Sequence, residues 1–125
     1  MILGIGIDII DIPRVERIAG EYGEDIITRV FTEDEIAYCQ SKKNSAINFA
    51  GRFAAKEAFL KALGTGLRGG IEWRDISVVC DELGKPSIAL SGKTKETADA
   101  REVKKVHVSI SHTAENATAV VILEG

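Results

Sequence analysis

Two carboxylates in the sequence occupy positions where a charged side chain is unusual. Glu57 follows Lys56 within a largely apolar helical pattern, and Asp8 lies in an apolar strand pattern beside Gly4 and Gly6. Charges in such surroundings must be paired, hydrogen-bonded or bound to a cation. Glycines leave Asp8 without shielding side chains and often permit close approach by a ligand or another backbone. Two carboxylates from different elements would suit Mg²⁺, which takes one or two protein carboxylates together with phosphate oxygens and water.

Each carboxylate also has a purely structural explanation. Glu57 can pair with Lys61 one helical turn later, which contributes only about 0.2–0.5 kcal/mol. Asp8 can be a solvated strand residue. From the residues alone, these structural explanations are the more common ones.

The only two histidines, His107 and His112, lie near the end of a predicted strand, with Ser109 between them. A lone strand histidine more often has a structural role than a chemical one. No serine here follows the G-x-S-x-G pattern of a strained nucleophile turn, so nucleophilic serine catalysis is disfavoured.

A glycine-rich segment begins at Gly64-Thr65-Gly66 and ends at Gly70. It lacks the Lys-Ser/Thr ending of a phosphate-binding P-loop. Its backbone N–H groups and Arg68 can still bind phosphate, although a flexible connection from helix to strand is the more common explanation.

The elements that must position these residues are predicted from hydrophobic periodicity and capping signals. Residues 2–9 alternate as a half-buried strand, with Ile5, Ile7 and Ile9 on one face and Asp8 on the other. Asp11 and Pro13 suit the start of a helix that Gly20 or Gly23 can end.

Further along the chain, Thr32 and Glu35 form a capping-box pattern for a helix over about 33–42. The clearest helix runs over 48–63 and ends at Gly64, with Lys56 on its apolar stripe and Glu57 at its edge. The remaining pattern predicts a hairpin of strands 76–80 and 86–90, a polar helix over about 93–102, and strands over 105–111 and 117–123.

Length and composition favour one globular domain over 1–125, with 45% hydrophobic and 28% charged residues. The net charge of -3 lacks the basic character of a nucleic-acid-binding domain. No stretch is long and apolar enough for a membrane span, and Cys39 and Cys80 fit neither a disulfide framework nor a metal motif. We therefore expect a cytosolic protein with reduced thiols and with neither nucleic acid nor membrane as a partner.

Three ordered motifs carry a resemblance to a known family. They are Gly4-Ile-Gly-Ile-Asp8, then Arg52-Phe-Ala-Ala-Lys56-Glu57-Ala-Phe-Leu-Lys61-Ala-Leu-Gly64-Thr-Gly66, and finally Val108-Ser-Ile-Ser-His112-Thr. The sequence resembles the holo-acyl-carrier-protein synthase family of phosphopantetheinyl transferases over nearly its whole length. The resemblance implies a single-domain α+β fold with an antiparallel-rich sheet packed with helices, as one subunit of a homotrimer with active sites at subunit interfaces.

The resemblance also implies a reaction and a set of site residues. A serine of apo acyl carrier protein would attack the β-phosphate of coenzyme A, which releases adenosine 3′,5′-bisphosphate and supports fatty acid biosynthesis. Asp8 and Glu57 would hold Mg²⁺, and Lys61 would meet the phosphates. Coenzyme A would lie beside the residues Lys61, Gly64, Thr65, Gly66, His107, Ser109 and His112, and the acidic carrier would dock on Arg14 and Arg17.

Three points stay open at this stage. The base that accepts the serine proton is Asp8 through a metal-bound water, Glu57, or one of the histidines, in that order of preference. A hydrolase could use the same carboxylates to cleave a nucleotide diphosphate with water. A binding module without catalysis would make Lys56 and Glu57 purely structural.

Overall fold

The computed structural model describes residues 1–125 and contains two separate antiparallel sheets. The larger sheet has three strands in the order β1-β5-β4, and the smaller one is the β2-β3 hairpin. In chain order the elements are β1 (Ile2–Asp11), α1 (Ile12–Tyr22), α2 (Glu24–Val30), α3 (Glu33–Gln40), α4 (Ser45–Leu63), a 3-10 turn η1 (Trp73–Asp75), β2 (Ile76–Cys80), β3 (Pro86–Leu90), α5 (Gly92–Ala100), β4 (Lys105–His112) and β5 (Asn116–Glu124). The predicted α+β class with antiparallel strands is therefore confirmed.

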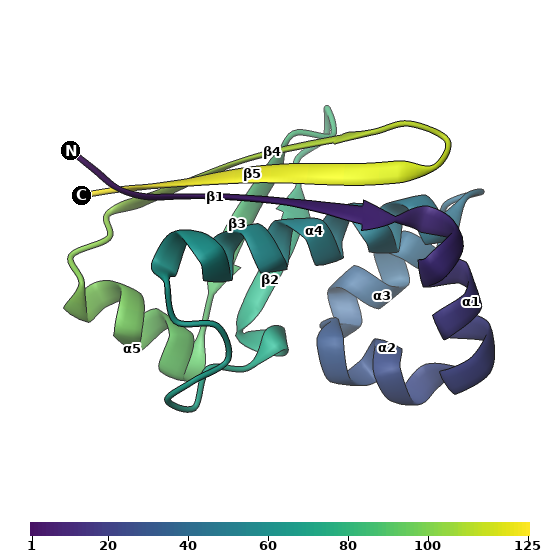
Figure 1. Cartoon of the computed structure of the whole chain (residues 1–125), viewed down its shortest axis with the longest axis horizontal. Coiled ribbons are helices and arrows are strands. Elements are labelled where there is room, and N and C mark those ends of the chain that lie inside the picture. Colours follow the sequence, from purple (N-terminus) through teal and green to yellow (C-terminus); the bar gives the residue numbers. More distant parts are fainter.

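Helix α4 lies along one face of the three-stranded sheet (Figure 1). Two glycines of β1 make this contact unusually close. A Cβ atom on Gly6 would lie 1.9 Å from the carbonyl oxygen of Ala58, and one on Gly4 would lie 2.1 Å from that of Ala62. No side chain fits at either position, so the backbone of α4 rests directly on the backbone of β1.

The main core lies between α4 and the two sheets. Its buried residues include Ala54 and Phe59 of α4, Ile76 of β2, and Val121 and Leu123 of β5. Alternation along β5 sends every second residue toward α4. This packing places the helix that carries Glu57 and Lys61 against the strand that carries Asp8.

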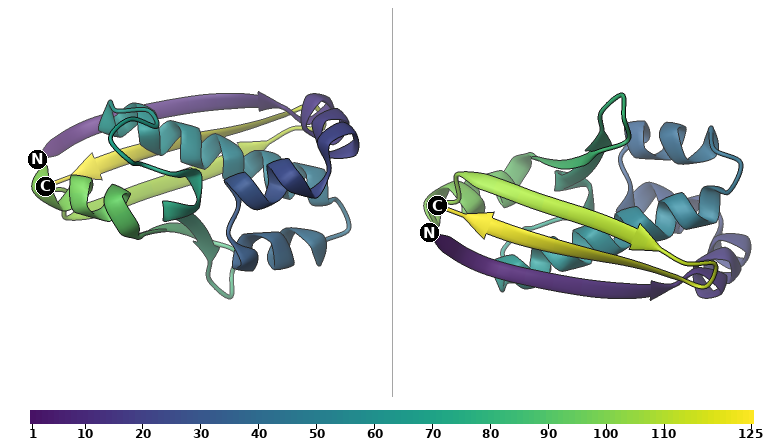
Figure 2. Two further views of the ribbon diagram at one scale, coloured as in Figure 1. Left: turned by 90° about the horizontal axis from the view of Figure 1, so that it is seen from below. Right: turned by 90° about the horizontal axis from the view of Figure 1, so that it is seen from above.

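The opposite face of the three-stranded sheet is uncovered (Figure 2, right). The side chains of Ile5, Ile7 and Ile9 are 64%, 63% and 65% exposed there. The predicted alternation of β1 is confirmed, but the glycine face, not the isoleucine face, packs against the core. The reason is that only glycine allows α4 to come this close.

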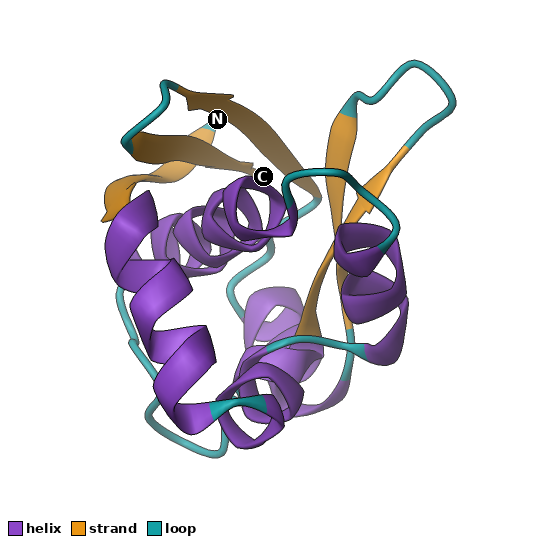
Figure 3. Ribbon diagram, turned by 90° about the vertical axis from the view of Figure 1, so that its right-hand side faces the viewer, coloured by secondary structure: helices purple, strands orange, loops and turns teal.

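Helices α1, α2 and α3 gather around the first half of α4 (Figures 1 and 3). The predicted capping box at the start of α3 is confirmed, because the Glu35 N–H donates to Thr32 Oγ1 at 3.2 Å and the Thr32 N–H donates to Glu35 Oε1 at 2.9 Å. Helix α2 was not predicted, since it follows α1 after the single residue Gly23, where a turn was expected.

The predicted hairpin has the expected bounds, and its loop projects from the molecule (Figure 3). Both cysteines are free thiols, as predicted. None of the five α-helices combines the length and the apolar character that a membrane crossing requires. The predicted cytosolic location stays a prediction.

Candidate active site

Asp8 and Lys61 form an ion pair where β1 passes α4. The Lys61 ammonium donates to Asp8 Oδ1 at 2.9 Å and to the Ile7 carbonyl oxygen at 3.1 Å. The Asp8 side chain is only 14% exposed, and its second oxygen, Oδ2, is buried with no hydrogen-bond partner. A buried carboxylate oxygen without a partner is costly, so this position suits a ligand that supplies positive charge.

Glu57 is the second carboxylate of the site. Burial raises the pKa of its carboxyl group, and the negative charge of Asp8 raises it further, while Lys61 opposes both effects. The local pair between Glu57 and Lys61 that the spacing allowed is not formed, because the lysine bonds to Asp8 instead. Two carboxylates from different elements thus lie close enough to repel each other.

A hollow of about 410 Å³ opens beside these groups. It is lined by Glu57, Leu60, Lys61, Gly64, Gly66, Leu67 and Trp73. Gly64 and Gly66 have φ angles of 80° and 57°, in the left-handed region that favours glycine, and they turn the chain away from the end of α4. Thr65 lies between them, and its hydroxyl donates to the Gly66 carbonyl oxygen at 3.0 Å.

The two carboxylates fit a small cation that prefers oxygen ligands. No group of three or more histidine, cysteine, aspartate or glutamate side chains is placed to hold a metal. Asp8 and Glu57 would therefore act with ligand oxygens from substrate or water, a mixture that Mg²⁺ commonly accepts. The unpartnered Asp8 Oδ2 is the observation that favours this fit.

The predicted nucleotide residues of β4 do not reach this hollow within one chain. His107 and Ser109 point to the uncovered face of the sheet, and β5 separates β4 from β1. His107 Nε2 lies 2.8 Å from Glu124 Oε1, and His112 Nδ1 lies 3.3 Å from the Thr113 carbonyl oxygen. A single chain brings together Asp8, Glu57, Lys61, Gly64 and Gly66, but not the histidines.

Arg14 and Arg17 lie on α1, which follows β1 without a break. Both side chains are exposed. They are available to a partner, and their predicted role in docking stays a prediction.

Lys56 belongs to a second, buried network on the other side of α4. Its ammonium lies 2.7 Å from Glu35 Oε1 and donates to the carbonyl oxygens of Trp73, at 3.1 Å, and Ile76. Glu35 Oε2 accepts from the Val78 N–H at 2.9 Å. Burial lowers the pKa of Lys56, and the Glu35 carboxylate opposes that change. The expectation that Lys56 must be paired is confirmed, and its place is structural.

Trp73 is the main residue of the hollow that sequence reasoning missed. It is the only tryptophan in the chain, and it lies in the short turn η1, far from the recognised motifs. The bond from Lys56 to its carbonyl oxygen holds it at the edge of the hollow.

Comparison with known proteins identifies the family. Residues 4–121 match the family model of the 4′-phosphopantetheinyl transferase superfamily. The chain belongs to this superfamily. A curated superfamily relative, the holo-[acyl-carrier-protein] synthase of Geotalea daltonii, is 50% identical over 124 residues, which cover 99% of each chain.

Solved structures of superfamily members have the same fold. The holo-[acyl-carrier-protein] synthase of Neisseria meningitidis matches with a TM-score of 0.93 and 34% identity over 100% of both chains. The enzyme of Helicobacter pylori, solved in complex with coenzyme A, matches with a TM-score of 0.85 and 35% identity over 96% of this chain and 99% of that one. The transferase fold and the resemblance drawn from the three motifs are thus confirmed.

Proposed function

We infer that this transferase moves the 4′-phosphopantetheine group of coenzyme A to a serine of apo acyl carrier protein. The products are the holo-carrier, which serves fatty acid biosynthesis, and adenosine 3′,5′-bisphosphate. The observation that carries this conclusion is the 50% identity to a holo-[acyl-carrier-protein] synthase across 99% of both chains. The Helicobacter pylori relative binds coenzyme A, which supports that donor for this chain as well.

The hollow beside α4 supplies groups that suit the diphosphate of coenzyme A. The Lys61 side chain is 54% exposed, so its ammonium can turn from Asp8 toward a phosphate oxygen without a large desolvation cost. In the transfer, the serine oxygen forms a bond to the phosphorus that bears the pantetheine arm, and the bond from that phosphorus to the leaving phosphate breaks. Lys61 stabilises the negative charge that develops on the oxygens.

The serine proton needs an acceptor. Asp8, acting through a bound water molecule, is the first candidate, and Glu57 is the second. The histidines follow, since no histidine of the same chain lines the hollow.

We further propose that Asp8 and Glu57 hold Mg²⁺. The buried unpartnered oxygen of Asp8 supports this, and so does the raised pKa of Glu57, which burial causes first and the negative charge of Asp8 second. A cation would satisfy the oxygen of Asp8 and relieve the repulsion between the two carboxylates. Bound Mg²⁺ would supply positive charge next to the diphosphate.

The uncovered sheet face supports a homotrimer. Ile5, Ile7 and Ile9 form an exposed apolar stripe, and contiguous stripes of this kind mark interfaces between proteins. His107 and Ser109 share that face, so packing copies through it would carry these residues toward the site of a neighbouring subunit. We expect Ile7→Glu to convert a trimer to monomers in sedimentation analysis, whereas Leu83→Glu, at a 95% exposed hairpin position, leaves the trimer intact.

The exposed arginines of α1 suit an acidic carrier protein. Reversing the charge in Arg14→Glu should raise the KM for the carrier and leave the KM for coenzyme A unchanged. Arg29→Glu makes the same charge change at an exposed position on α2 and serves as the control. An unchanged carrier KM in Arg14→Glu would remove this residue from the docking surface.

The decisive experiment is intact-mass spectrometry of apo acyl carrier protein incubated with the enzyme, coenzyme A and Mg²⁺. A chelator-sensitive gain of one phosphopantetheine is the expected result. Loss of coenzyme A without any gain on the carrier would instead indicate a hydrolase. No turnover, with a carrier that a known transferase modifies, would indicate a binding module.

A further inference from the structure

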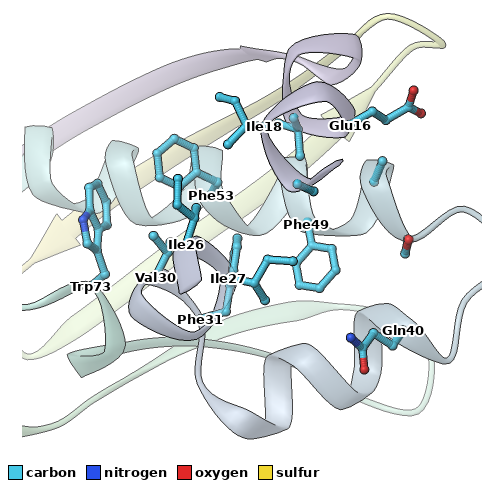
Figure 4. Close-up of a pocket in the computed structure, with 14 residues that line it drawn as sticks. Glu16, Ile18, Ile26, Ile27, Val30, Phe31, Gln40, Phe49, Phe53 and Trp73 are labelled. Atoms are coloured by element: carbon cyan, nitrogen blue, oxygen red, sulfur yellow. The ribbon is translucent and has the colours of Figure 1, made fainter. Parts of the chain in front are cut away.

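Helix α4 presents different residues to the elements that surround it. A second hollow, of about 540 Å³, lies among α1, α2, α3 and α4, and Phe49 and Phe53 line it from α4 (Figure 4). Trp73 lines both this hollow and the one at the candidate active site. Arg52 lines neither. It precedes Lys56 by one helical turn, on the side of α4 that meets α3 and β2.

Arg52 is a buried cation without an anion. It is only 5% exposed, and no carboxylate lies within ion-pair distance of it. Its Nη1 donates to the Asn48 carbonyl oxygen at 3.5 Å, its Nη2 donates to Cys80 Sγ at 3.3 Å, and its guanidinium lies 4.1 Å from the centre of the Tyr38 ring. The Nε atom is buried and has no hydrogen-bond partner. A buried guanidinium in these surroundings lacks the negative charge that would stabilise it.

The next turn of α4 shows how a buried cation is satisfied in this fold. There, Lys56 has the Glu35 carboxylate of α3 as its partner, and Glu35 also binds a backbone N–H of β2. At the level of Arg52, the residue one turn after Glu35 on α3 is Cys39, and the last residue of β2 is Cys80. Thiols therefore stand where the next turn has a carboxylate, and a thiol sulfur is only a weak acceptor.

The shape of the guanidinium indicates which anion would fit. The Nε and Nη2 atoms lie on one edge, and their N–H groups point in parallel, which is the arrangement that binds both oxygens of a carboxylate. In Arg52, Nη2 already faces the Cys80 sulfur, and Nε is free. A sulfur atom that carries two oxygens would offer one acceptor to each N–H. Cysteine sulfinic acid has this group, and its ionised form supplies the missing charge.

We propose that Cys80 is a site of oxidation by hydroperoxides, and that Arg52 holds the sulfinate product as a bidentate ion pair. Neither residue has a part in the proposed transfer reaction. The sulfinate would join α4 to β2 by an ion pair, beside the pair of Lys56 and Glu35 that joins α4 to α3.

The oxidation takes two steps, each of which consumes one molecule of hydrogen peroxide. In the first, the thiol proton of Cys80 passes to water, the sulfur attacks one peroxide oxygen, and the O–O bond breaks. The released hydroxide takes up a proton to become water, and the sulfur is left as a sulfenic acid. The second step repeats the attack from the sulfenic sulfur and gives the sulfinic acid, whose proton passes to solvent. The Arg52 guanidinium stabilises the negative charge that develops on the oxygens in both steps.

The surroundings select Cys80 over Cys39. Cys80 is half-buried at the end of β2, and the exposed residues 81–85 follow it, so a molecule as small as hydrogen peroxide can reach its sulfur. Cys39 is 0% exposed, and burial raises the pKa of its thiol to about 11. Because the thiolate is the reactive form, Cys39 should stay unmodified.

The first test is peptide mass spectrometry after treatment with hydrogen peroxide. In the wild type, the peptide with Cys80 should gain two oxygen atoms, and the peptide with Cys39 should gain none. Arg52→Lys keeps a positive charge but lacks the paired N–H groups, so sulfinate should form about tenfold more slowly, which corresponds to the loss of one charge-assisted hydrogen bond. Arg29→Lys, at an exposed position of α2, is the matched control and should behave as the wild type does.

Two outcomes of this test would overturn the proposal. One is an equal rate of sulfinate formation in the wild type and in Arg52→Lys, which would show that the guanidinium edge has no part in it. The other is a loss of two hydrogen atoms with the two cysteine peptides joined, which would show a disulfide between Cys39 and Cys80 in place of a sulfinate.

A second test needs no peroxide. The carboxylate in Cys80→Asp places two oxygens at the same number of bonds from Cβ as a sulfinate does, and Cys80→Asn has the same shape without the charge. With Arg52 present, the Asp variant should melt higher than the Asn variant by roughly 2–8 °C, and in an Arg52→Met background it should melt lower, because its carboxylate is then unpaired. Equal Tm values for the Asp and Asn variants beside Arg52 would overturn the proposal. Neither test depends on the transfer reaction.

Discussion

Helix α4 carries two lysine–carboxylate pairs that differ in burial and in how completely their polar atoms are bonded. Lys56 and Glu35 are fully buried, and each also bonds to backbone groups of other elements. Lys61 is 54% exposed, and its partner Asp8 keeps one buried oxygen without a partner. The Lys56–Glu35 pair is inaccessible to ligands, while the Lys61–Asp8 pair still has a carboxylate oxygen that can bind one.

The difference separates a pair that stabilises the fold from a pair that is available for binding and catalysis. The buried pair joins α3, α4 and β2, and it holds the turn that carries Trp73. The exposed pair costs little to rearrange, so its lysine can exchange a carboxylate for a phosphate oxygen. We expect changes to the buried pair to alter stability first, and changes to the exposed pair to alter activity first.

The largest effect should follow from breaking the buried pair. Lys56→Met strands the Glu35 carboxylate, and we expect a loss of about 3–5 kcal/mol in the free energy of unfolding, measured by urea denaturation. Adding Glu35→Gln removes the stranded charge but keeps an acceptor for only one of the two backbone N–H groups that Glu35 binds, so the double variant should recover part of that loss. A double variant that loses the sum of both single effects would show that the two residues act independently.

Changes to the carboxylates of the candidate active site should lower activity. Asp8→Asn or Glu57→Gln should lower the transfer rate by about 10²–10³-fold, because each removes a carboxylate charge that would hold Mg²⁺ next to the diphosphate. Calorimetric titration with Mg²⁺ should show weaker binding in both variants. Asp99→Asn makes the same change in the exposed pair with Lys95 and should leave both readouts unchanged.

The raised pKa of Glu57 adds a prediction about stability without divalent cations. Because the folded protein binds this proton more tightly than the unfolded chain, the contribution of Glu57 to stability falls as the pH rises from its ordinary pKa of 4.5 through its folded pKa. Glu57→Gln should therefore gain stability relative to the wild type between mildly acidic and neutral pH. An equal pH dependence in the two proteins would contradict the raised pKa of Glu57, which burial causes first and the negative charge of Asp8 second.

The buried thiol of Cys39, near Glu35, should make stability depend on pH in the alkaline range. Burial raises the pKa of the Cys39 thiol from 9.0 to about 11. The folded state then holds the proton more tightly than the unfolded state, so stability falls as the pH rises from 9 to 11, by roughly 2–3 kcal/mol. The stability difference between the wild type and Cys39→Ala should shrink by that amount over this range, and a constant difference would contradict the prediction.

The smallest effect on stability should come from the exposed lysine. Lys61→Met removes a partly exposed ion pair, which contributes about 0.2–1 kcal/mol. The KM for coenzyme A should nevertheless rise clearly, because the ammonium that faces the diphosphate is lost. A large loss of stability with normal coenzyme A binding would show that the Lys61–Asp8 pair has a structural role and would contradict its assignment to activity.

Local patterns in the sequence determined most of the secondary structure. The capping box at Thr32, the hairpin of β2 and β3, and the end of α4 at Gly64 depend on contacts within a few residues, so they follow from the residues alone. The order of the motifs also determined the family, and with it the grouping of Asp8, Glu57 and Lys61.

Only the tertiary structure decided which partner each charge has and which face of β1 is buried. Lys61 bonds to Asp8 across the fold and not to Glu57 one turn away, and Lys56 reaches Glu35 on a different helix. The position of Trp73 between the two hollows, and the close approach of α4 to Gly6, likewise join distant segments. Periodicity describes which residues share a face, but the packing of other elements decides what that face meets.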